Sequence, residues 1–202
     1  MLKRIILASQ STSRKKIFKS TGLNFVSKKP NISEEKEKIK IKRKTKNARL
    51  ISKKLAQLKA LSISKAHKKN LVVGSDTMIV CNKKIIDKAK NIKEAKTKLT
   101  FLSGKKHQIY TSVCVCFNTK IIWQHTERTT VHIRNLNESD ICDYLKKCKK
   151  DILKSVGCYQ VEGMGPNIFS KIEGDFYNVM GFPIIQFLKF IRKETHWKKI
   201  FM

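Results

Sequence analysis

The chain has 202 residues, of which 41% are hydrophobic and 30% charged, and its formal net charge at pH 7 is +30. This length and composition are typical of a soluble globular protein, and they fit one domain over residues 1–202. No apolar run approaches the ~18 residues that a membrane-spanning helix needs. The run Ile5–Ala8 after Lys3-Arg4 is too short for a secretory signal. We therefore expect a cytoplasmic protein with no membrane partner.

The excess of positive charge has two interpretations. A strongly basic surface can recruit nucleic acid or anionic membrane by releasing counterions. Alternatively, the excess reflects biased composition, because it is mostly Lys and runs from end to end of the chain. Nucleic-acid-binding faces usually combine Arg with aromatic residues in one patch, whereas aromatic residues make up only 8% here and no RNP, KH or zinc-finger spacing occurs. The composition favours solvated surface lysines, and nucleic acid is not expected as a specific partner.

The six cysteines do not form a metal-binding or redox motif in the sequence. They lack a C-x-x-C pair, and no His lies at metal-ligand spacing from them. Without a secretory signal, the simplest interpretation is that they are reduced thiols.

The predicted elements begin with a strand and a helix joined by a hydroxyl-rich turn. The apolar run Ile5–Ala8 predicts a buried strand, and residues 12–21 predict a helix with Ser11 as its N-cap and Gly22 just beyond its end. The free N–H groups at the start of this helix, together with Arg14, make the turn a candidate anion site. The turn lacks the Walker glycine pattern and is therefore not a P-loop.

Residues 23–27 predict a second short strand, and the polar stretch 28–46, which contains Pro30, predicts a loop. A helix is expected over residues 46–68. Lys59 lies near the apolar stripe of that helix, where its ammonium group needs either a partner or a route to solvent.

The stretch Leu71–Val80 predicts the central strand of the fold, because β-forming apolar residues flank a single carboxylate, Asp76. An ionised carboxylate in such a run is costly to bury unless a cation meets it. Taken alone, Asp76 could equally cap a turn. A turn at residues 81–84 and a returning strand at 85–86 would bring Lys88 back toward the level of Asp76.

The remaining elements predict one α/β unit with a mixed sheet. The chain has no internal repeat and no linker that would separate two domains. Between the fourth and the last predicted helix, glycines at 157, 163, 165 and 174 permit close approach of the backbone to a ligand. The expected elements are a helix from Asn91 to Leu102, strands over 108–117 and 121–134 around an Asn118-Thr119 turn, a helix over 137–147, and a helix from Asn178 to Lys193 interrupted near Gly181 and Pro183.

Six short motifs occur in one order along the chain. They are Leu7–Arg14, Ile32-Ser33-Glu34, Leu55–Ala60, Gly74-Ser75-Asp76-Thr77, Lys88-Ala89 and Leu102–Thr111. In this order they resemble the Maf family of nucleoside triphosphate pyrophosphatases, from Ile6 to about Leu188. Each motif alone is weak, but six in order are specific. The resemblance implies a Maf/ITPase-like domain, with a twisted mixed sheet, flanking helices and a cleft between two lobes.

The resemblance also implies a reaction, which is metal-dependent cleavage between the α- and β-phosphates of a nucleoside triphosphate to give a monophosphate and pyrophosphate. Asp76 would be the general base and, with Glu34, a ligand of Mg²⁺ or Mn²⁺. Displacement at phosphorus depends on positioning and charge neutralisation, which a metal ion and several cations supply. The residues that would bind the substrate are Ser9, Arg14, Lys59 and Lys88.

Three positions, Ser13, Thr77 and Glu162, are implied to select the base. Family members that act on 7-methyl-GTP carry Glu at the third position and lack Arg at the first, whereas members that prefer dTTP and UTP carry Gln at the third. An ionised Glu only accepts hydrogen bonds, and guanine presents two adjacent donors. The chain is therefore more similar to the 7-methyl-GTP branch, and we expect a purine-leaning substrate, modified or non-canonical nucleotides included, in a house-cleaning role.

Departures from the family pattern leave alternatives open. Thr12 and Ser13 replace Pro-Arg of the common signature, Ser33 replaces an Asp, and Ala89 replaces a Pro. The departures at Ser33 and Thr12 keep an inactive family member as one alternative. A basic nucleic-acid-associated or division-related protein is another, because of the charge and the family's link to septum formation. The family further suggests a homodimer.

Overall fold

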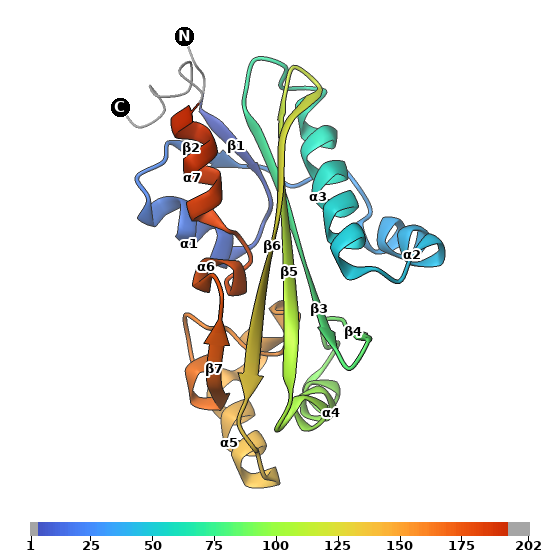
Figure 1. Cartoon of the computed structure of the whole chain (residues 1–202), viewed down its shortest axis with the longest axis vertical. Coiled ribbons are helices and arrows are strands. Elements are labelled where there is room, and N and C mark those ends of the chain that lie inside the picture. The colour runs from blue at the N-terminus through green and yellow to red at the C-terminus, as the bar shows by residue number, and fades with distance from the viewer. Residues whose placement is uncertain (1–3, 194–202) are drawn as a thin grey trace.

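The structure is a computed structural model that describes residues 4–193. Its centre is a seven-stranded mixed sheet in the order β2-β1-β3-β5-β6-β7, with β4 paired to β3. In Figure 1 the long strands β3, β5 and β6 run along the molecule and helices flank them. The predicted α/β class with a mixed sheet is confirmed. The strands are β1 Ile5–Ala8, β2 Phe25–Ser27, β3 Val72–Cys81, β4 Lys84–Ile86, β5 Lys106–Phe117, β6 Lys120–Ile133 and β7 Phe169–Glu173.

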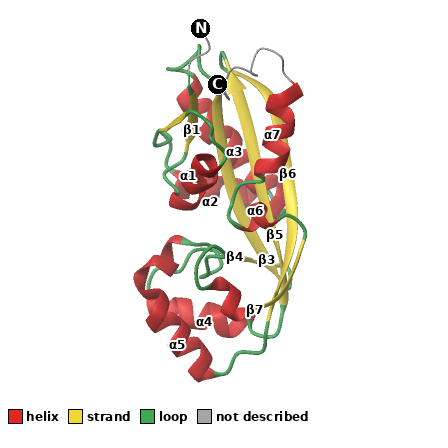
Figure 2. Cartoon of the chain, turned by 90° about the vertical axis from the view of Figure 1, so that its left-hand side faces the viewer, coloured by secondary structure: helices red, strands yellow, loops and turns green. Residues whose placement is uncertain are grey.

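The helices form two groups in Figure 2, with α1, α2, α3 and α7 around one end of the long strands and α4 and α5 at the other. Among the described residues, none of these helices has the length and apolarity needed to span a bilayer. The helices are α1 Thr12–Ser20, α2 Glu34–Lys44, α3 Ala48–Ser64, α4 Ile92–Leu102, α5 Glu138–Cys148, α6 Phe176–Val179 and α7 Ile184–Lys193, with 3₁₀ turns η1 Lys149–Lys154 and η2 Gly165–Ile168.

Strand β1 is apolar throughout because both of its faces are covered. Ile5 and Leu7 pack in the cluster formed with α1 and α7, whereas Ile6 and Ala8 pack in the cluster formed with α3. Alternate side chains of a strand point to opposite faces of the sheet, so a strand covered by helices on both faces needs a continuous apolar run. Strand β1 is parallel to β2 and β3, and the rest of the sheet is antiparallel.

The antiparallel part of the sheet confirms the predicted turns. Asn118 and Thr119, which join β5 to β6, have φ of 47° and 62°, and Asn82 and Lys83, which join β3 to β4, have φ of 48° and 62°. Two consecutive left-handed residues match the right-handed twist of a tight hairpin. The register sets Thr77 of β3 opposite Thr111 of β5.

The predicted loop over residues 28–46 is wrong, because α2 occupies Glu34–Lys44 within it. The helix carries acidic residues in its first turn and basic residues in its last turn, which is the arrangement that the helix dipole favours. Its sequence contains few apolar residues, and Ile41 is its only buried residue. A helix with so narrow an apolar stripe gives little periodic signal.

Two other elements differ from the sequence prediction, and a third matches it. Helix α3 is shorter than the predicted 46–68, and strand β7, which pairs with β6, was not predicted. The last predicted helix is interrupted as expected, with α6 and α7 on either side of Gly181, whose φ is +98°. A residue with this φ cannot continue a helix, and glycine adopts it without steric cost.

Gly74 lets α3 lie directly against β3. A Cβ atom at this position would lie 2.4 Å from the carbonyl oxygen of Ala56 and 2.7 Å from the backbone nitrogen of Ala60. Both contacts are with helix backbone, which cannot rotate away as a side chain can. The close approach brings the neighbouring residues of β3 within reach of α3 side chains.

We predict that Gly74→Ala lowers the free energy of unfolding by about 2–3 kcal/mol, because α3 must move away from the sheet. Chemical denaturation of the purified protein measures this. Gly163→Ala is the matched control, since a Cβ there meets its nearest atom only at 3.7 Å, and its effect should stay within about 0.5 kcal/mol. Equal unfolding free energies for the two variants would contradict the prediction.

Candidate active site

Lys59 joins two carboxylates at the centre of the candidate site. Its Nζ lies 2.8 Å from Oδ1 of Asp76 and 2.8 Å from Oε2 of Glu34, and its side chain is only 4% exposed. The ammonium group also lies 3.4 Å from the carbonyl oxygen of Ser75. A buried charge requires such partners, because desolvation would otherwise be prohibitive. The side chain of Lys59 therefore points into the protein and does not extend to solvent.

The charges around Glu34 keep it ionised. Partial burial would raise its pKa, but the positive charges of Lys59, Arg14 and Lys88 outweigh that effect and hold the pKa below its usual value. Glu34 opens helix α2, where the helix dipole also favours a negative charge. The site thus presents a carboxylate on each side of Lys59, and the carboxylate of Glu34 is ionised.

Arg14 is held in place by three hydrogen bonds. Its Nε donates to the carbonyl oxygen of Gly181 at 2.8 Å, its Nη1 to Oγ of Ser9 at 3.3 Å and its Nη2 to Oγ1 of Thr77 at 3.1 Å. Burial lowers the pKa of Arg14, and the negative charges of Asp76 and Glu34 act in the opposite direction. The guanidinium group is consequently a fixed positive charge at the start of α1.

Lys88 belongs to the same charged group, as the β3–β4 hairpin predicts. Its pKa is lowered by burial and then by the charges of Arg14 and Lys59, and Glu34 and Asp76 oppose this shift. The structure therefore brings together five charged side chains that are scattered along the sequence. They are Arg14 on α1, Glu34 on α2, Lys59 on α3, Asp76 on β3 and Lys88 before α4.

The three residues implied in base selection, Ser13, Thr77 and Glu162, take part in two hydrogen bonds. The Ser13 hydroxyl donates to Oε1 of Glu162, and Oγ1 of Thr77 lies 3.0 Å from Oγ1 of Thr111. Because Thr77 also accepts from Arg14, each of the two contacts is joined to one of two neighbouring residues of α1, Ser13 and Arg14. Ser13 and Glu162 are separated by 149 positions in the chain and meet only in the fold.

Sequence reasoning missed two residues that support the site from behind. The carbonyl oxygen of Gly181 accepts hydrogen bonds from both Arg14 and Ser75. The backbone carbonyl oxygen of the buried Asn178 accepts a hydrogen bond from the Thr111 hydroxyl at 3.1 Å. The side-chain amide of Asn178 donates to Oγ1 of Thr129 at 2.9 Å. The break in the helix near Gly181 was the only signal in the sequence, and it did not reveal what the freed carbonyl groups bind.

A buried histidine attaches the segment that carries Glu162. His107 of β5 is fully buried, and its Nε2 is hydrogen-bonded to the hydroxyl of Tyr159 at 2.5 Å. Burial, reinforced by the charge of His132, lowers the pKa of His107 to about 4. The neutral imidazole therefore forms part of the core beneath this segment.

The carboxylates at the site fit a hard divalent cation that arrives with phosphates. Within residues 4–193, no group of three or more His, Cys, Asp and Glu side chains could hold a metal ion by itself. Mg²⁺, however, usually binds through one or two carboxylates together with substrate phosphates. Glu34 and Asp76, which both contact Lys59, supply that number of carboxylates.

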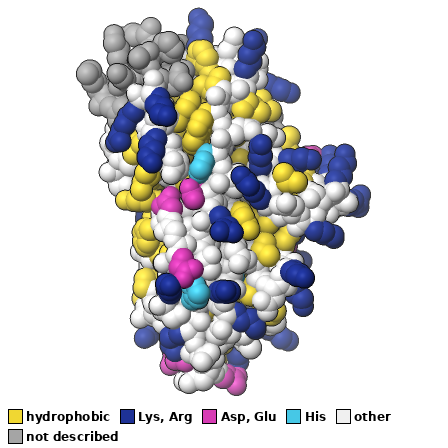
Figure 3. Space-filling view, in the orientation of Figure 1, with side chains coloured by type: hydrophobic (Ala, Val, Ile, Leu, Met, Phe, Trp, Pro, Cys, Tyr) yellow, Lys and Arg dark blue, Asp and Glu magenta, His cyan; other side chains and the backbone are white. Residues whose placement is uncertain are grey.

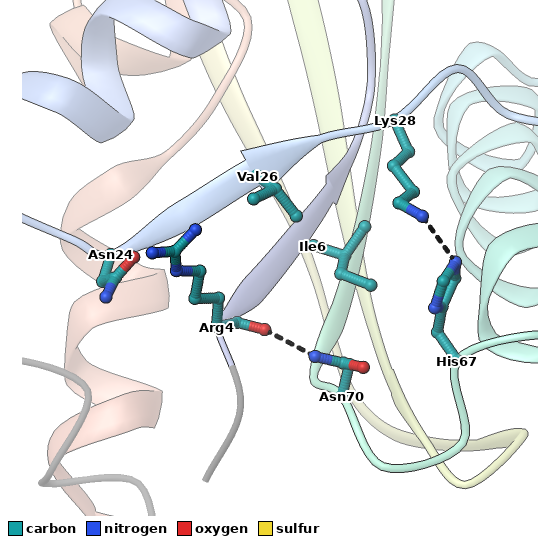
Figure 4. A pocket seen from close by; sticks show the side chains of 7 residues that line it. All are labelled: Arg4, Ile6, Asn24, Val26, Lys28, His67 and Asn70. Carbon is teal, nitrogen blue, oxygen red and sulfur yellow. Dashed lines mark hydrogen bonds between the residues drawn. The ribbon is translucent and has the colours of Figure 1, made fainter.

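Two surface cavities lie away from the five charged residues. One, of about 520 Å³, is lined by Arg4, Lys28 and His67 among others (Figure 4), and Lys28 Nζ lies 3.0 Å from His67 Nε2 there. The other, of about 600 Å³, lies between α4 and α5. Neither contains a residue predicted from the sequence to act in the site. The side-chain chemistry, and not the cavity volume, locates the candidate site.

The chain is similar to known proteins over nearly its whole length. The sequence profile of the family described as "Maf-like protein" matches residues 4–194. A "Nucleoside triphosphate pyrophosphatase" of Pelagibacter ubique is 36% identical over 192 residues, which cover 95% of this chain and 98% of the relative. A protein of the same name from Hyphomonas neptunium is 34% identical, over 93% of this chain and 94% of its own. A "7-methyl-GTP pyrophosphatase" of Bartonella henselae is 37% identical, over 91% and 92%.

The lowered pKa of His107 predicts a loss of stability in mild acid. The unfolded chain binds a proton at this histidine near pH 6.5 and the folded chain only near pH 4, so the stability from this group is lost as pH falls between these values. From pH 7 to pH 5 the loss is about 2 kcal/mol. Denaturation at both pH values should show this difference in the wild type and not in His107→Gln. The same fall in the variant would assign it to other groups.

Proposed function

Because the chain belongs to the Maf family, we propose that it is a nucleoside triphosphate pyrophosphatase. It would hydrolyse the α–β phosphoanhydride bond and release a nucleoside monophosphate and diphosphate. The relatives named for this activity, which align over nearly their whole length, support the proposal. The observation that carries it is the buried Lys59 between Glu34 and Asp76, beside Arg14 and Lys88. A triphosphate needs several cations around it, and hydrolysis needs a base, and this group of residues contains both.

In this proposal Asp76 accepts the proton of the attacking water. Its Oδ1 is fixed by Lys59, so the carboxylate keeps one orientation relative to the sheet. A general base held in this manner typically contributes ~10²–10⁴ to the rate. Glu34 and Asp76 would hold Mg²⁺ or Mn²⁺, which, when bound, neutralises charge on the phosphate oxygens.

The positive side chains would bind the phosphates. The guanidinium group of Arg14 is a planar fork of donors. Its hydrogen bonds to Ser9, Thr77 and Gly181 fix the direction in which this fork points. Lys59 and Lys88 add point charges, and the Ser9 hydroxyl adds a neutral contact beside Arg14. The pKa of Lys88 is lowered first by burial and then by the charges of Arg14 and Lys59. A site that gathers three positive side chains in this way favours an anion.

Base selection is proposed to involve Ser13, Thr77 and Glu162. The Ser13 hydroxyl uses one oxygen of the Glu162 carboxylate, and a carboxylate can accept further hydrogen bonds at both oxygens. The N1–H and 2-amino groups of guanine match these acceptors. A purine-leaning preference that includes modified guanine is thus supported by Glu162 and by the Bartonella henselae relative named for 7-methyl-GTP. Such an activity would keep modified nucleotides out of nucleic acids.

The rival function, a basic protein associated with nucleic acid or with division, gains less support. Figure 3 shows Lys and Arg side chains along the whole length of one face and not gathered in one patch. This distribution supports the interpretation of the +30 charge as solvated surface lysines. We further propose that residues 1–202 form one domain, since one sheet and one family profile account for most of them. The homodimer and the cytoplasmic location stay predictions, the latter in keeping with six free cysteines.

Asp76→Asn is predicted to lower kcat/KM for pyrophosphate release by ~10²–10⁴, because the amide cannot accept the proton of water. Asn can still accept the hydrogen bond from Lys59, so circular dichroism should show an unchanged fold. Asp151→Asn is the matched control, since Asp151 pairs only with the neighbouring Lys154 at the surface in the described structure. Turnover retained by Asp76→Asn would refute the assignment of the base.

A panel of triphosphates tests the base preference. We predict higher kcat/KM for GTP and 7-methyl-GTP than for dTTP and UTP, with Mg²⁺ or Mn²⁺ present. Glu162→Gln should shift this ratio toward dTTP and UTP by ~10-fold or more, because the amide provides a donor as well as an acceptor. Glu138→Gln, whose carboxylate lies at the surface beside Lys96, should leave the ratio unchanged. A wild-type preference for dTTP over all guanine nucleotides would overturn this prediction.

A further inference from the structure

Helix α2, which carries Glu34 into the site, has little apolar attachment of its own. Ile41 is its only buried residue, and Ile39 is 53% exposed. A helix of 11 residues is marginal in water without tertiary contacts. Its position over the site therefore depends to an unusual degree on polar contacts with other elements.

Besides the pair of Glu34 with Lys59, Asp87 provides a second polar contact between α2 and the rest of the protein. Its Oδ1 lies 2.6 Å from Nζ of Lys38, and its Oδ2 lies 2.7 Å from Nζ of Lys42. Lys38 and Lys42 are four positions apart and so project from one face of α2. Each carboxylate oxygen thus pairs with one ammonium group. Asp87, which lies outside α2, thereby joins the segment before α4 to two lysines of that helix.

The charge balance of the chain makes this contact distinctive. The chain has 45 basic and only 15 acidic residues. Among the described residues, most other acidic side chains pair with a single basic side chain, often one close in sequence. Asp87 meets two lysines of one helix. Partial burial would raise the pKa of Asp87, but the hydrogen bonds and charges of Lys38 and Lys42 lower it. The carboxylate is therefore ionised and pairs with both lysines of α2.

The backbone around Asp87 is fixed from the other side by α4. Nζ of Lys98 donates to the carbonyl oxygens of Asp87 and Lys88, both at 2.8 Å, and pairs with Glu94 at 2.7 Å. The residue that follows Asp87 is Lys88, one of the proposed phosphate ligands. The short segment before α4 is therefore tied to α2 by a side chain and to α4 by its backbone.

We propose that Asp87 is a positioning residue that couples α2 to the Lys88 segment, so that Glu34 and Lys88 are held at the phosphates together. This inference rests on the proposed function, in which both residues meet the substrate or its metal ion. Asp76 and Lys59 lie on β3 and α3 and do not depend on the tie. Loss of Asp87 should therefore weaken binding of the triphosphate and its metal ion more than it slows the chemical step.

The test compares Asp87→Asn with Glu37→Gln. Asn keeps the shape of Asp but cannot pair with two ammonium groups. Glu37→Gln removes the same charge from a pair, with Lys40, that lies within α2 itself. For Asp87→Asn we expect KM and the Mg²⁺ concentration at half-maximal rate to rise 3- to 10-fold, with kcat within ~2-fold of the wild type. The control should match the wild type in all three.

Hydrogen–deuterium exchange of the free protein gives a readout that does not depend on activity. Amides of Glu34–Lys44 should exchange faster in Asp87→Asn, whereas those of α3 should not change. The double variant Lys38→Met/Lys42→Met should reproduce both effects, and adding Asp87→Asn to it should cause no further loss, because all three changes break one contact.

The outcomes separate this inference from the function on which it rests. Unchanged exchange of α2 together with an unchanged KM in Asp87→Asn would overturn the coupling, and so would equal effects in Glu37→Gln. A wild-type protein that releases no pyrophosphate from any triphosphate would instead refute the proposed function. In that case faster exchange in Asp87→Asn would still show the tie, and its role in substrate binding would be rejected.

Discussion

The ammonium group of Lys59 is the interaction on which the site depends, because it is buried and meets two carboxylates from different elements. Breaking a buried ion pair by removing one partner typically costs ~3–5 kcal/mol. Separating Lys59 from Asp76 would therefore cost a large part of the folding free energy, and burial of Asp76 depends on Lys59. The half-exposed Glu34 is the partner that can move, since its side chain is 53% exposed. The site thus has a rigid half, built on β3 and α3, and a half attached through α2.

The fold supports each half by a different physical means. The rigid half depends on close backbone packing, in which the missing Cβ of Gly74 lets α3 approach β3. The buried hydrogen bonds of Thr111, Asn178 and Gly181 then hold β3 and Arg14 from behind. The other half depends on charge pairs at partly exposed lysines. Such pairs are individually weak and sensitive to salt, which suits a part of the site that must admit a large anion.

Much of the fold and the grouping of charged residues around Asp76 could be read from the sequence. The strand around Asp76, the hairpin turns and the cap at Ser11 follow from local chemistry, and the structure has each of them. The motifs indicated which charged residues to group. Helix α2 and strand β7 escaped prediction because neither has a strong apolar period, and their stability comes from residues far away in the chain.

The sequence by itself determined the α/β class, the family and the set of polar residues around Asp76, since periodicity, caps and motif order are local properties. Only the tertiary structure decided how these residues pair. Lys59 meets Glu34 as well as Asp76, Ser13 meets Glu162, and Asp87 meets α2. Each of these contacts joins residues that are distant in sequence, and in a chain with 45 basic side chains many partners were available for each acid. Burial and backbone geometry, which exist only after folding, selected among them.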